Sequence, residues 1–278
     1  MGARQDGRVS RASYLVSVLM QWSRISERVR PPEAGTPEAN VQRPGTSEEY
    51  TGISNLEAMA SAVNYQRFLT GLLTLAAGRP GAGRAIADFG AGTGPLARAA
   101  RSLGWQVTCV ELDPALRARL RDDRFDAVAS LDDISPGSLD FLYSYNVLEH
   151  IEDDADVVSG FHRVLKPGAP LLLYVPAFPL LYSSMDRLIG HVRRYRKRGL
   201  ADLVESAGFT VETCHYADSI GFAAALAYRV IGDDSGKLDG RAVRLYDRFV
   251  FPASRRLDYF AKRFFGKNLV LIAHRSGG

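Results

Sequence analysis

Cysteine and histidine are scarce in this chain of 278 residues, which holds two cysteines and five histidines. Cys109 and Cys214 each lie in an apolar run typical of a strand, so we expect two buried free thiols and a reducing, cytoplasmic location. The histidines are scattered and form no H-E-x-x-H motif, and no C-x-x-C pair occurs. This spacing predicts that the protein holds no metal ion.

Long apolar runs are also lacking. The run at residues 14–22 is too short to span a membrane and is interrupted by serine and glutamine. The first twenty residues lack the apolar core and the small-residue cleavage site of a signal peptide. We therefore expect no transmembrane segment, although 46% hydrophobic residues are ample for a core.

Charge is distributed unevenly along the chain. Residues 1–185 carry 18 Lys and Arg against 21 Asp and Glu, a net charge of −3, whereas residues 186–278 carry 17 against 10, a net charge of +7. A basic C-terminal third could face an anionic substrate, a membrane surface or a nucleic acid, or it could be a solvated face without a partner.

The stretch from Ile86 to Ala97 organises the chain. It reads as a buried parallel strand, a turn with three glycines in five residues, and a helix that begins at Pro95. Glycines allow backbone conformations closed to other residues and let a ligand approach closely. The spacing is G-x-G-x-G, and Pro95 stands where a dinucleotide-binding fingerprint needs its third glycine. Asp88, two residues before the turn, would repel a pyrophosphate but could hold an ammonium group, which disfavours a nicotinamide enzyme.

The D-F-G-A-G-T-G sequence resembles motif I of the class I methyltransferases that use S-adenosylmethionine (SAM). Glu111, 23 residues after Asp88, ends the next apolar strand, where an acidic residue bonds a ribose diol. The N-V-L-E-H-I run at residues 146–151 and the L-K-P-G turn at residues 165–168 are also similar to family motifs. The resemblance covers about residues 60–215.

This resemblance implies SAM as the cofactor and a doubly wound α/β fold with a seven-stranded, mostly parallel sheet. The helix at residues 53–76 is expected to cover the cofactor, and Asn64 is a further candidate contact. In the loop after the third strand, either Ser130 or Asp132 is expected to contact the adenine. The cofactor-binding residues that the resemblance implies are Tyr65, Asp88, Gly90, Ala91, Gly92, Gly94, Glu111, Leu112, Ser130, Leu131, Asp132, Asn146 and Val147.

The acceptor side is expected beyond the fourth and fifth strands, because ligands bind at the carboxyl ends of parallel strands near the switch point. His150 follows the fourth strand and could be a general base or could only shape its loop. His191 and Tyr195 belong to a D-x-x-x-G-H-x-R-R-Y run that resembles one in a bacterial subgroup of these methyltransferases. We predict His150, His191 and Tyr195 as catalytic candidates, with a solvated basic turn as the alternative for that run.

The chain divides into four predicted segments. Residues 1–50 hold a helix and a Pro-rich linker and are predicted to act as a lid, and residues 51–218 form the SAM-binding core. Residues 219–266 form a helical insertion or cap, and residues 267–278 hold the final strand and tail. The aromatic and basic insertion could cap the substrate pocket, form a homodimer face or lie on a membrane.

The sequence therefore predicts a SAM-dependent methyltransferase that acts on a small molecule, in natural-product biosynthesis. The alternatives are an enzyme that modifies a lipid-linked or glycan intermediate at a membrane surface and a SAM-binding protein without catalysis. A nucleic-acid methyltransferase is disfavoured, because the chain has no D/N-P-P-Y/W tetrapeptide and no recognisable nucleic-acid module.

Overall fold

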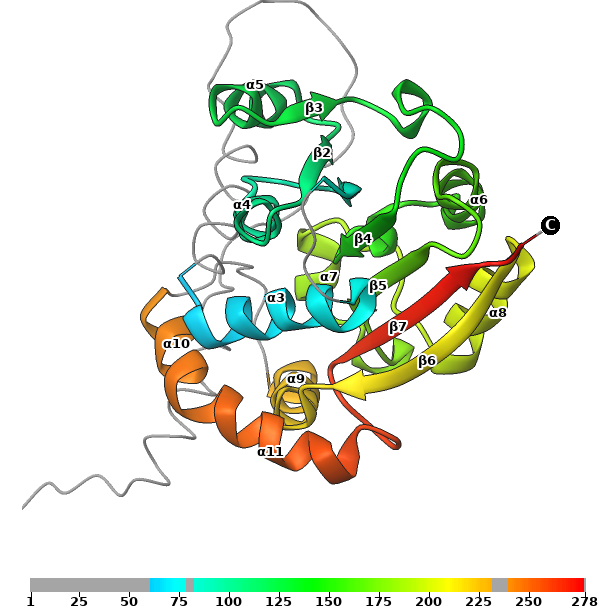
Figure 1. The fold of residues 1–278 in the computed structure, drawn as a ribbon. Coiled ribbons are helices and arrows are strands. Elements are labelled where there is room, and N and C mark those ends of the chain that lie inside the picture. The colour runs from blue at the N-terminus through cyan, green and yellow to red at the C-terminus, as the bar shows by residue number, and fades with distance from the viewer. Residues whose placement is uncertain (1–60, 79–82, 232–239, 278) are drawn as a thin grey trace, which may run out of the picture.

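The computed structural model describes residues 61–78, 83–231 and 240–277 (Figure 1). The predicted lid, which comprises the helix at residues 13–29 and the Pro-rich stretch 31–47, lies outside the described residues. The predicted helix at residues 53–76 is described from residue 61 onward, and there it forms α3, Val63–Ala77.

One seven-stranded sheet forms the centre of the molecule, in the order β3-β2-β1-β4-β5-β7-β6. The strands are β1 (Ala85–Phe89), β2 (Gln106–Val110), β3 (Asp126–Val128), β4 (Phe141–Tyr145), β5 (Pro170–Pro176), β6 (Phe209–Ala217) and β7 (Asn268–Arg275). Neighbouring strands pair in parallel from β3 to β5, and β7 runs antiparallel to both β5 and β6. The predicted doubly wound sheet is confirmed, with the carboxyl ends of β1, β4 and β5 at one edge.

Helices cover both faces of the sheet, and each face has its own apolar core. On one face α3, α4 and α5 pack against side chains such as Phe141, Tyr143 and Tyr174. On the other face α6 and α8 pack around Phe161, Leu171 and Leu200. These helices are α4 (Pro95–Ser102), α5 (Pro114–Asp122), α6 (Asp154–Val164) and α8 (Lys197–Ser206). The strand β5 is buried along its whole length, as expected for a parallel strand with both faces covered.

The connection between β6 and β7 is helical. It contains α9 (Ser219–Ile231), α10 (Gly240–Leu245), the π-helical turn η4 (Tyr246–Val250) and α11 (Phe251–Ala261). The insertion is helical as predicted, and the π turn divides its second helical stretch into α10 and α11. In Figure 1, α10 and α11 form the outermost layer beside α9 and α3.

Two buried carboxylates attach this helical insertion to the core. Asp247 in η4 accepts hydrogen bonds from the backbone N–H groups of Asn64 and Tyr65, which lie in the first turn of α3. Asp258 in α11 accepts from the N–H groups of Asp218 and Ser219 at the start of α9. Buried donors left without such partners are costly, so these contacts fix the position of both helix starts.

No helix in the described parts of the chain has both the length and the apolar character that crossing a membrane requires.

Candidate active site

Backbone with positive φ follows four strands at the same edge of the sheet. Gly90 follows β1 with φ 80°, and Asn146 follows β4 with φ 53°. Phe178 lies just beyond β5 with φ 59°, and Asp218 follows β6 with φ 60°. Residues other than glycine rarely adopt this conformation, and such strain concentrates at functional sites. This edge is therefore where a ligand site is expected.

The glycine turn lies directly against the loop after β4. A Cβ atom on Gly90 would be 2.2 Å from Cγ2 of Val147, and one on Gly94 would be 2.7 Å from Cδ2 of Leu120. Both positions have positive φ, so glycine is required for conformation as well as for space. Gly94 then starts α4, with Pro95 in its first turn as predicted.

Glu111 lies beside this turn. Its carboxylate accepts a hydrogen bond from the N–H of Gly92 at 2.7 Å and another from the N–H of Asp113 at 3.0 Å. The carboxylate is only partly buried, and its remaining lone pairs can accept from a diol, the role that the sequence predicts. Ala91 lies buried within the turn.

Three other predicted residues border the same edge at β2 and β3. Leu112 follows Glu111 and is 82% exposed, an apolar surface suited to one face of a base. Ser130 starts a short 3₁₀ turn and accepts a hydrogen bond from the N–H of Asp132. Asp132 is exposed and pairs with Arg163 at 3.0 Å, whereas Leu131 is buried. Ser130 and Asp132 both remain candidates for the adenine contact.

Asp88 is buried at the end of β1, beneath the turn. Its Oδ2 atom has no hydrogen-bond partner in the described part of the chain. Burial raises the pKa of this carboxyl from 3.8 to about 7. A cation that reached Asp88 would therefore replace a proton as well as fill an open acceptor.

Tyr65 and Asn146 connect α3 to the loop after β4. The Tyr65 ring packs edge-on against Phe251 at 5.5 Å and against Tyr174 at 6.3 Å. Burial raises the pKa of its phenol to about 12, while a hydrogen bond with Asn146 acts in the opposite direction. Asn64 uses its side-chain amide to bond the backbone of Asp247. Both α3 residues thus hold the helix over the sheet edge, and a cofactor contact by either one stays a prediction.

His150 and His191, two of the predicted catalytic candidates, come together although they lie 41 residues apart in the sequence. Their rings meet edge to face with centroids 4.6 Å apart. The carbonyl of Gly190 lies 3.2 Å from Nδ1 of His150, and a carbonyl can only accept, so that nitrogen carries the proton. Burial, and then the neighbouring His191, lower the pKa of His150. Its Nε2 atom is consequently free to accept a proton.

Asp186 orients His191 from behind. Its Oδ1 atom lies 2.7 Å from Nδ1 of His191 and 2.8 Å from Nε of Arg194. Burial alone would raise the pKa of Asp186, but these hydrogen bonds lower it to about 2, so it is ionised. An ionised carboxylate accepts a proton on Nδ1, so in the neutral ring of His191 the lone pair lies on Nε2. This nitrogen faces Oε1 of Glu149 at 3.6 Å.

Tyr195 supports the site from within the core. Its side chain is 6% exposed, and its hydroxyl donates to the carboxylate of Asp154 at 2.7 Å. Burial, and then this hydrogen bond, raise the pKa of the Tyr195 phenol. The backbone of Tyr195 pairs with the segment after β5. The structure therefore places Tyr195 where it holds the loop that carries His191. A contact of its hydroxyl with substrate stays a prediction.

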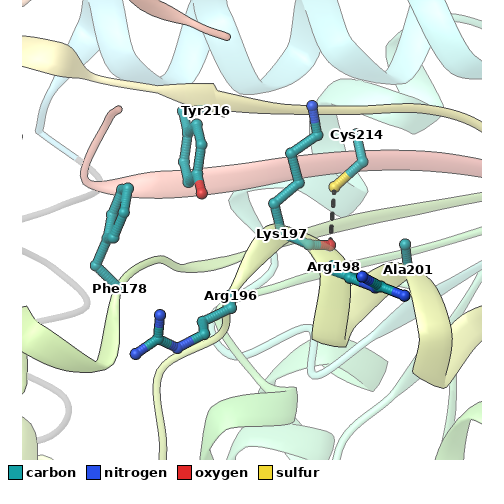
Figure 2. A pocket seen from close by; sticks show the side chains of 7 residues that line it. All are labelled: Phe178, Arg196, Lys197, Arg198, Ala201, Cys214 and Tyr216. Atoms are coloured by element: carbon teal, nitrogen blue, oxygen red, sulfur yellow. Dashed lines mark hydrogen bonds between the residues drawn. The ribbon is translucent and has the colours of Figure 1, made fainter. Parts of the chain in front are cut away.

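A pocket of about 450 Å³ opens beyond Tyr195, between α8 and β6 (Figure 2). Figure 2 shows Phe178 and Tyr216 at one end and Arg198 and Ala201 at the other. The rings of Phe178 and Tyr216 stack with centroids 4.7 Å apart. The remaining residues that line the pocket are Arg196, Lys197 and Cys214. Cys214 is half-buried rather than buried as expected, whereas Cys109 is buried.

Sequence reasoning assigned no role to Glu149, and it included Asp186 only as the first residue of the D-x-x-x-G-H-x-R-R-Y run. Glu149 is fully buried, and neither of its carboxylate oxygens has a hydrogen-bond partner among the described residues. Burial raises its pKa from 4.5 to about 8. An acidic residue within the otherwise apolar N-V-L-E-H-I run was the available signal. The histidine spacing could not show the cluster, because His191 lies 41 residues after His150 in the sequence.

Comparison with curated proteins shows partial matches. A protein described as a probable S-adenosylmethionine-dependent methyltransferase of Mycolicibacterium smegmatis is 31% identical over 139 residues, 47% of this chain and 54% of that protein. A ubiquinone biosynthesis O-methyltransferase of Xanthomonas euvesicatoria is 35% identical over 102 residues, 33% of this chain and 43% of that protein. The chain thus spans about half the length of the curated relatives it matches.

Solved structures share the fold. A Haemonchus contortus phosphoethanolamine N-methyltransferase 2 in complex with S-adenosyl-L-methionine has a TM-score of 0.51 and 22% identity, over 75% of this chain and 52% of that one. A SAM-dependent methyltransferase from Archaeoglobus fulgidus has a TM-score of 0.51 and 14% identity, over 75% and 94% of the two chains. At such identities the likeness concerns the fold alone.

A family model described as a methyltransferase domain matches residues 61–213, more than half of the chain. The match includes the glycine turn, Glu111, Glu149 and both histidines of the site. With the sheet order and the turn already described, it shows that this chain belongs to the methyltransferase-domain family, whose cofactor is SAM.

Proposed function

We propose that this protein transfers a methyl group from SAM to an ionisable hydroxyl of a small-molecule acceptor, of the kind made in natural-product biosynthesis. One observation carries the proposal. The glycine turn with Glu111 and the two histidines with free Nε2 atoms lie along the same sheet edge, joined by the contact of Gly90 with Val147. A cofactor held by the turn would thus have its methyl group close to groups that accept a proton.

The chemistry needs little from the protein. The acceptor oxygen attacks the methyl carbon in line with the S–CH₃ bond, and the bonding electron pair goes to sulfur, which loses its positive charge. Alignment of the two reactants supplies most of the rate gain. A histidine whose Nε2 is unprotonated takes the proton from the hydroxyl, and Asp186 stabilises the charged ring of His191.

A hydroxyl acceptor is supported by the curated relatives named as ubiquinone biosynthesis O-methyltransferases. It is also supported by the site itself, since a histidine is well suited to assist an ionisable hydroxyl near neutral pH. The pocket behind Phe178 adds three cationic side chains and two stacked rings. An aromatic acceptor with an acidic substituent would match that lining.

A second candidate function, methylation of a lipid-linked acceptor at a membrane surface, is favoured by the outer face of η4 and α11. Four aromatic side chains there are 63% exposed or more: Phe249, Tyr259, Phe260 and Phe264. Residues 240–266 carry seven Lys and Arg, and their only two acidic residues, Asp247 and Asp258, are buried. Aromatic and cationic side chains together are typical of helices that lie in an anionic membrane surface.

The proposed transfer predicts that His150→Ala and His191→Ala each keep wild-type affinity for S-adenosylhomocysteine but lose turnover by about 100-fold or more, because each removes a proton acceptor. The measurement is release of S-adenosylhomocysteine with a panel of phenols and catechols, with amines for comparison. His162→Ala is the control, because this half-buried histidine of α6 packs on Phe209 and not on the cluster. Wild-type rates in both variants would contradict a role for the cluster. Cofactor binding without turnover on any acceptor would favour a non-catalytic SAM-binding protein.

The raised pKa of Asp88 predicts pH-dependent cofactor binding. The ammonium group of S-adenosylhomocysteine favours ionised Asp88, so below pH 7 binding must expel a proton from a carboxyl whose pKa is about 7. Affinity should therefore weaken as pH falls from 8 to 6, by at most about tenfold per pH unit below the pKa. Calorimetric titrations across this range measure it. Asp88→Asn should remove the dependence, and an unchanged slope in that variant would assign it to another group.

The exposed face predicts binding to vesicles that contain anionic lipid. Phe260→Ser together with Phe264→Ser should weaken co-sedimentation with such vesicles by about tenfold or more, because both rings would otherwise enter the interface. Leu75→Ser is the matched control, since Leu75 is 66% exposed on α3. Binding should also fall with salt. Absence of binding with a concentration-dependent molecular mass would instead favour a homodimer through this face.

A further inference from the structure

Three potential metal ligands converge beside the predicted methyl-transfer position. Glu149, His150 and His191 each offer one ligand atom, and these three atoms lie within 4.8 Å of one another. Glu149 is fully buried, whereas His150 lies at the exposed side of the cluster. Two histidines and a carboxylate form a common ligand set for catalytic zinc and similar cations.

Glu149 lacks the partners that a buried carboxylate normally has. Neither of its oxygens accepts a hydrogen bond within the described ranges, and Oε1 faces Nε2 of His191 at 3.6 Å. That separation is too long for a hydrogen bond. Nδ1 of His191 holds its proton toward Asp186, so Nε2 presents a lone pair toward Oε1, and an ionised Glu149 would present a second lone pair to it. Such an arrangement is unfavourable unless a positively charged species lies between them.

The distance between Oε1 of Glu149 and Nε2 of His191 fits a shared metal ion better than a shared proton. In a tetrahedral zinc site with ligand bonds of about 2.1 Å, two ligand atoms lie about 3.4 Å apart. The 3.6 Å between Glu149 and His191 is close to this value. His150 completes the set from the open side, and its Nε2 is free because Nδ1 bonds the carbonyl of Gly190.

The surrounding shell is also that of a metal site. Asp186 accepts the Nδ1 proton of His191, and Asp186 itself is held by Arg194 and by the N–H of Ser183. Carboxylates that orient a ligand histidine from behind are typical of metal centres, and their loss usually weakens affinity by about 10- to 100-fold. The backbone N–H of Val192 bonds the carbonyl of Glu149 and so ties the two ligand segments together.

We propose that Glu149, His150 and His191 bind a divalent d-block cation such as Zn²⁺, with a coordination position left open to the acceptor. The binding of the cation stands on the geometry alone, and only its catalytic role rests on the proposed function. The bound cation takes up the Nε2 lone pairs that accept a proton in the metal-free site. An acceptor hydroxyl bound at the open position therefore releases its proton to solvent, and the resulting oxygen anion forms the new bond to the methyl carbon. The S–CH₃ bond breaks and its electron pair stays on sulfur.

The test starts with the full chain freed of metal by a chelator and titrated calorimetrically with Zn²⁺, with visible spectra of Co²⁺ as a report of coordination. The expected result is one site per chain. Glu149→Gln and His191→Ala should each weaken Zn²⁺ binding at least tenfold. His274→Ala is the matched control, because His274 pairs with Glu212 at 2.8 Å on the surface. Thermal unfolding of each variant without metal checks that it folds.

Several outcomes separate this inference from the proposed function. No Zn²⁺ site, or affinity equal in wild type, Glu149→Gln and His191→Ala, would overturn the metal site. Loss of binding in His274→Ala alone would also overturn it. Turnover that persists in the chelated protein would overturn the catalytic role of the metal while leaving the methyltransferase intact. Glu205→Ala, an exposed substitution on α8, should change neither Zn²⁺ binding nor turnover.

Discussion

The contact between Gly90 and Val147 determines how the rest of the site is arranged. It joins the turn after β1 to the loop after β4 at a distance that leaves no room for a side chain at position 90. Because β1 and β4 are adjacent parallel strands, their carboxyl ends already lie side by side. Because Gly90 also touches Val147, the glycine turn lies directly beside the Glu149–His150 segment. A side chain at position 90 would push the turn after β1 away from the loop after β4.

Buried carboxylates perform two different tasks in this protein. Asp186, Asp247 and Asp258 are saturated with hydrogen bonds and fix segments in place. Asp88 and Glu149 are equally buried but keep oxygens without partners within the described residues, and burial raises the pKa of both. An unsatisfied buried carboxyl costs stability, so its retention indicates a ligand that completes it. Both lie at the sheet edge where the strained residues gather.

Much of the fold and of the cofactor side follows from the sequence. The glycine turn and Glu111 were predictable because they depend on local spacing and on short apolar runs, and the doubly wound sheet was expected from the resemblance to the methyltransferase family. The close approach of His150 and His191 was expected only in outline, from the rule that parallel strands end at one edge. Glu149 was not singled out, since burial of one acidic residue depends on the chain that folds over it from residues 186–195.

Other features could not be predicted from the sequence, because they too depend on contacts between segments that are distant in the chain. The π turn at residues 246–250 interrupts an otherwise regular helical pattern, and it places Asp247 where its carboxylate bonds α3. Tyr195 was predicted as a catalytic candidate because it belongs to the D-x-x-x-G-H-x-R-R-Y run, yet its ring is buried in the core. Whether residues 13–29 cover the site lies outside the described residues and stays a prediction.

The central claim is that SAM lies across the glycine turn with its ribose on Glu111. Calorimetric titration of S-adenosylhomocysteine into wild type and Glu111→Ala tests it most directly. Loss of a charge-assisted hydrogen bond should weaken binding by about 1.5–3 kcal/mol, and Glu205→Ala should leave it unchanged. Equal affinity of wild type and Glu111→Ala would contradict the claim.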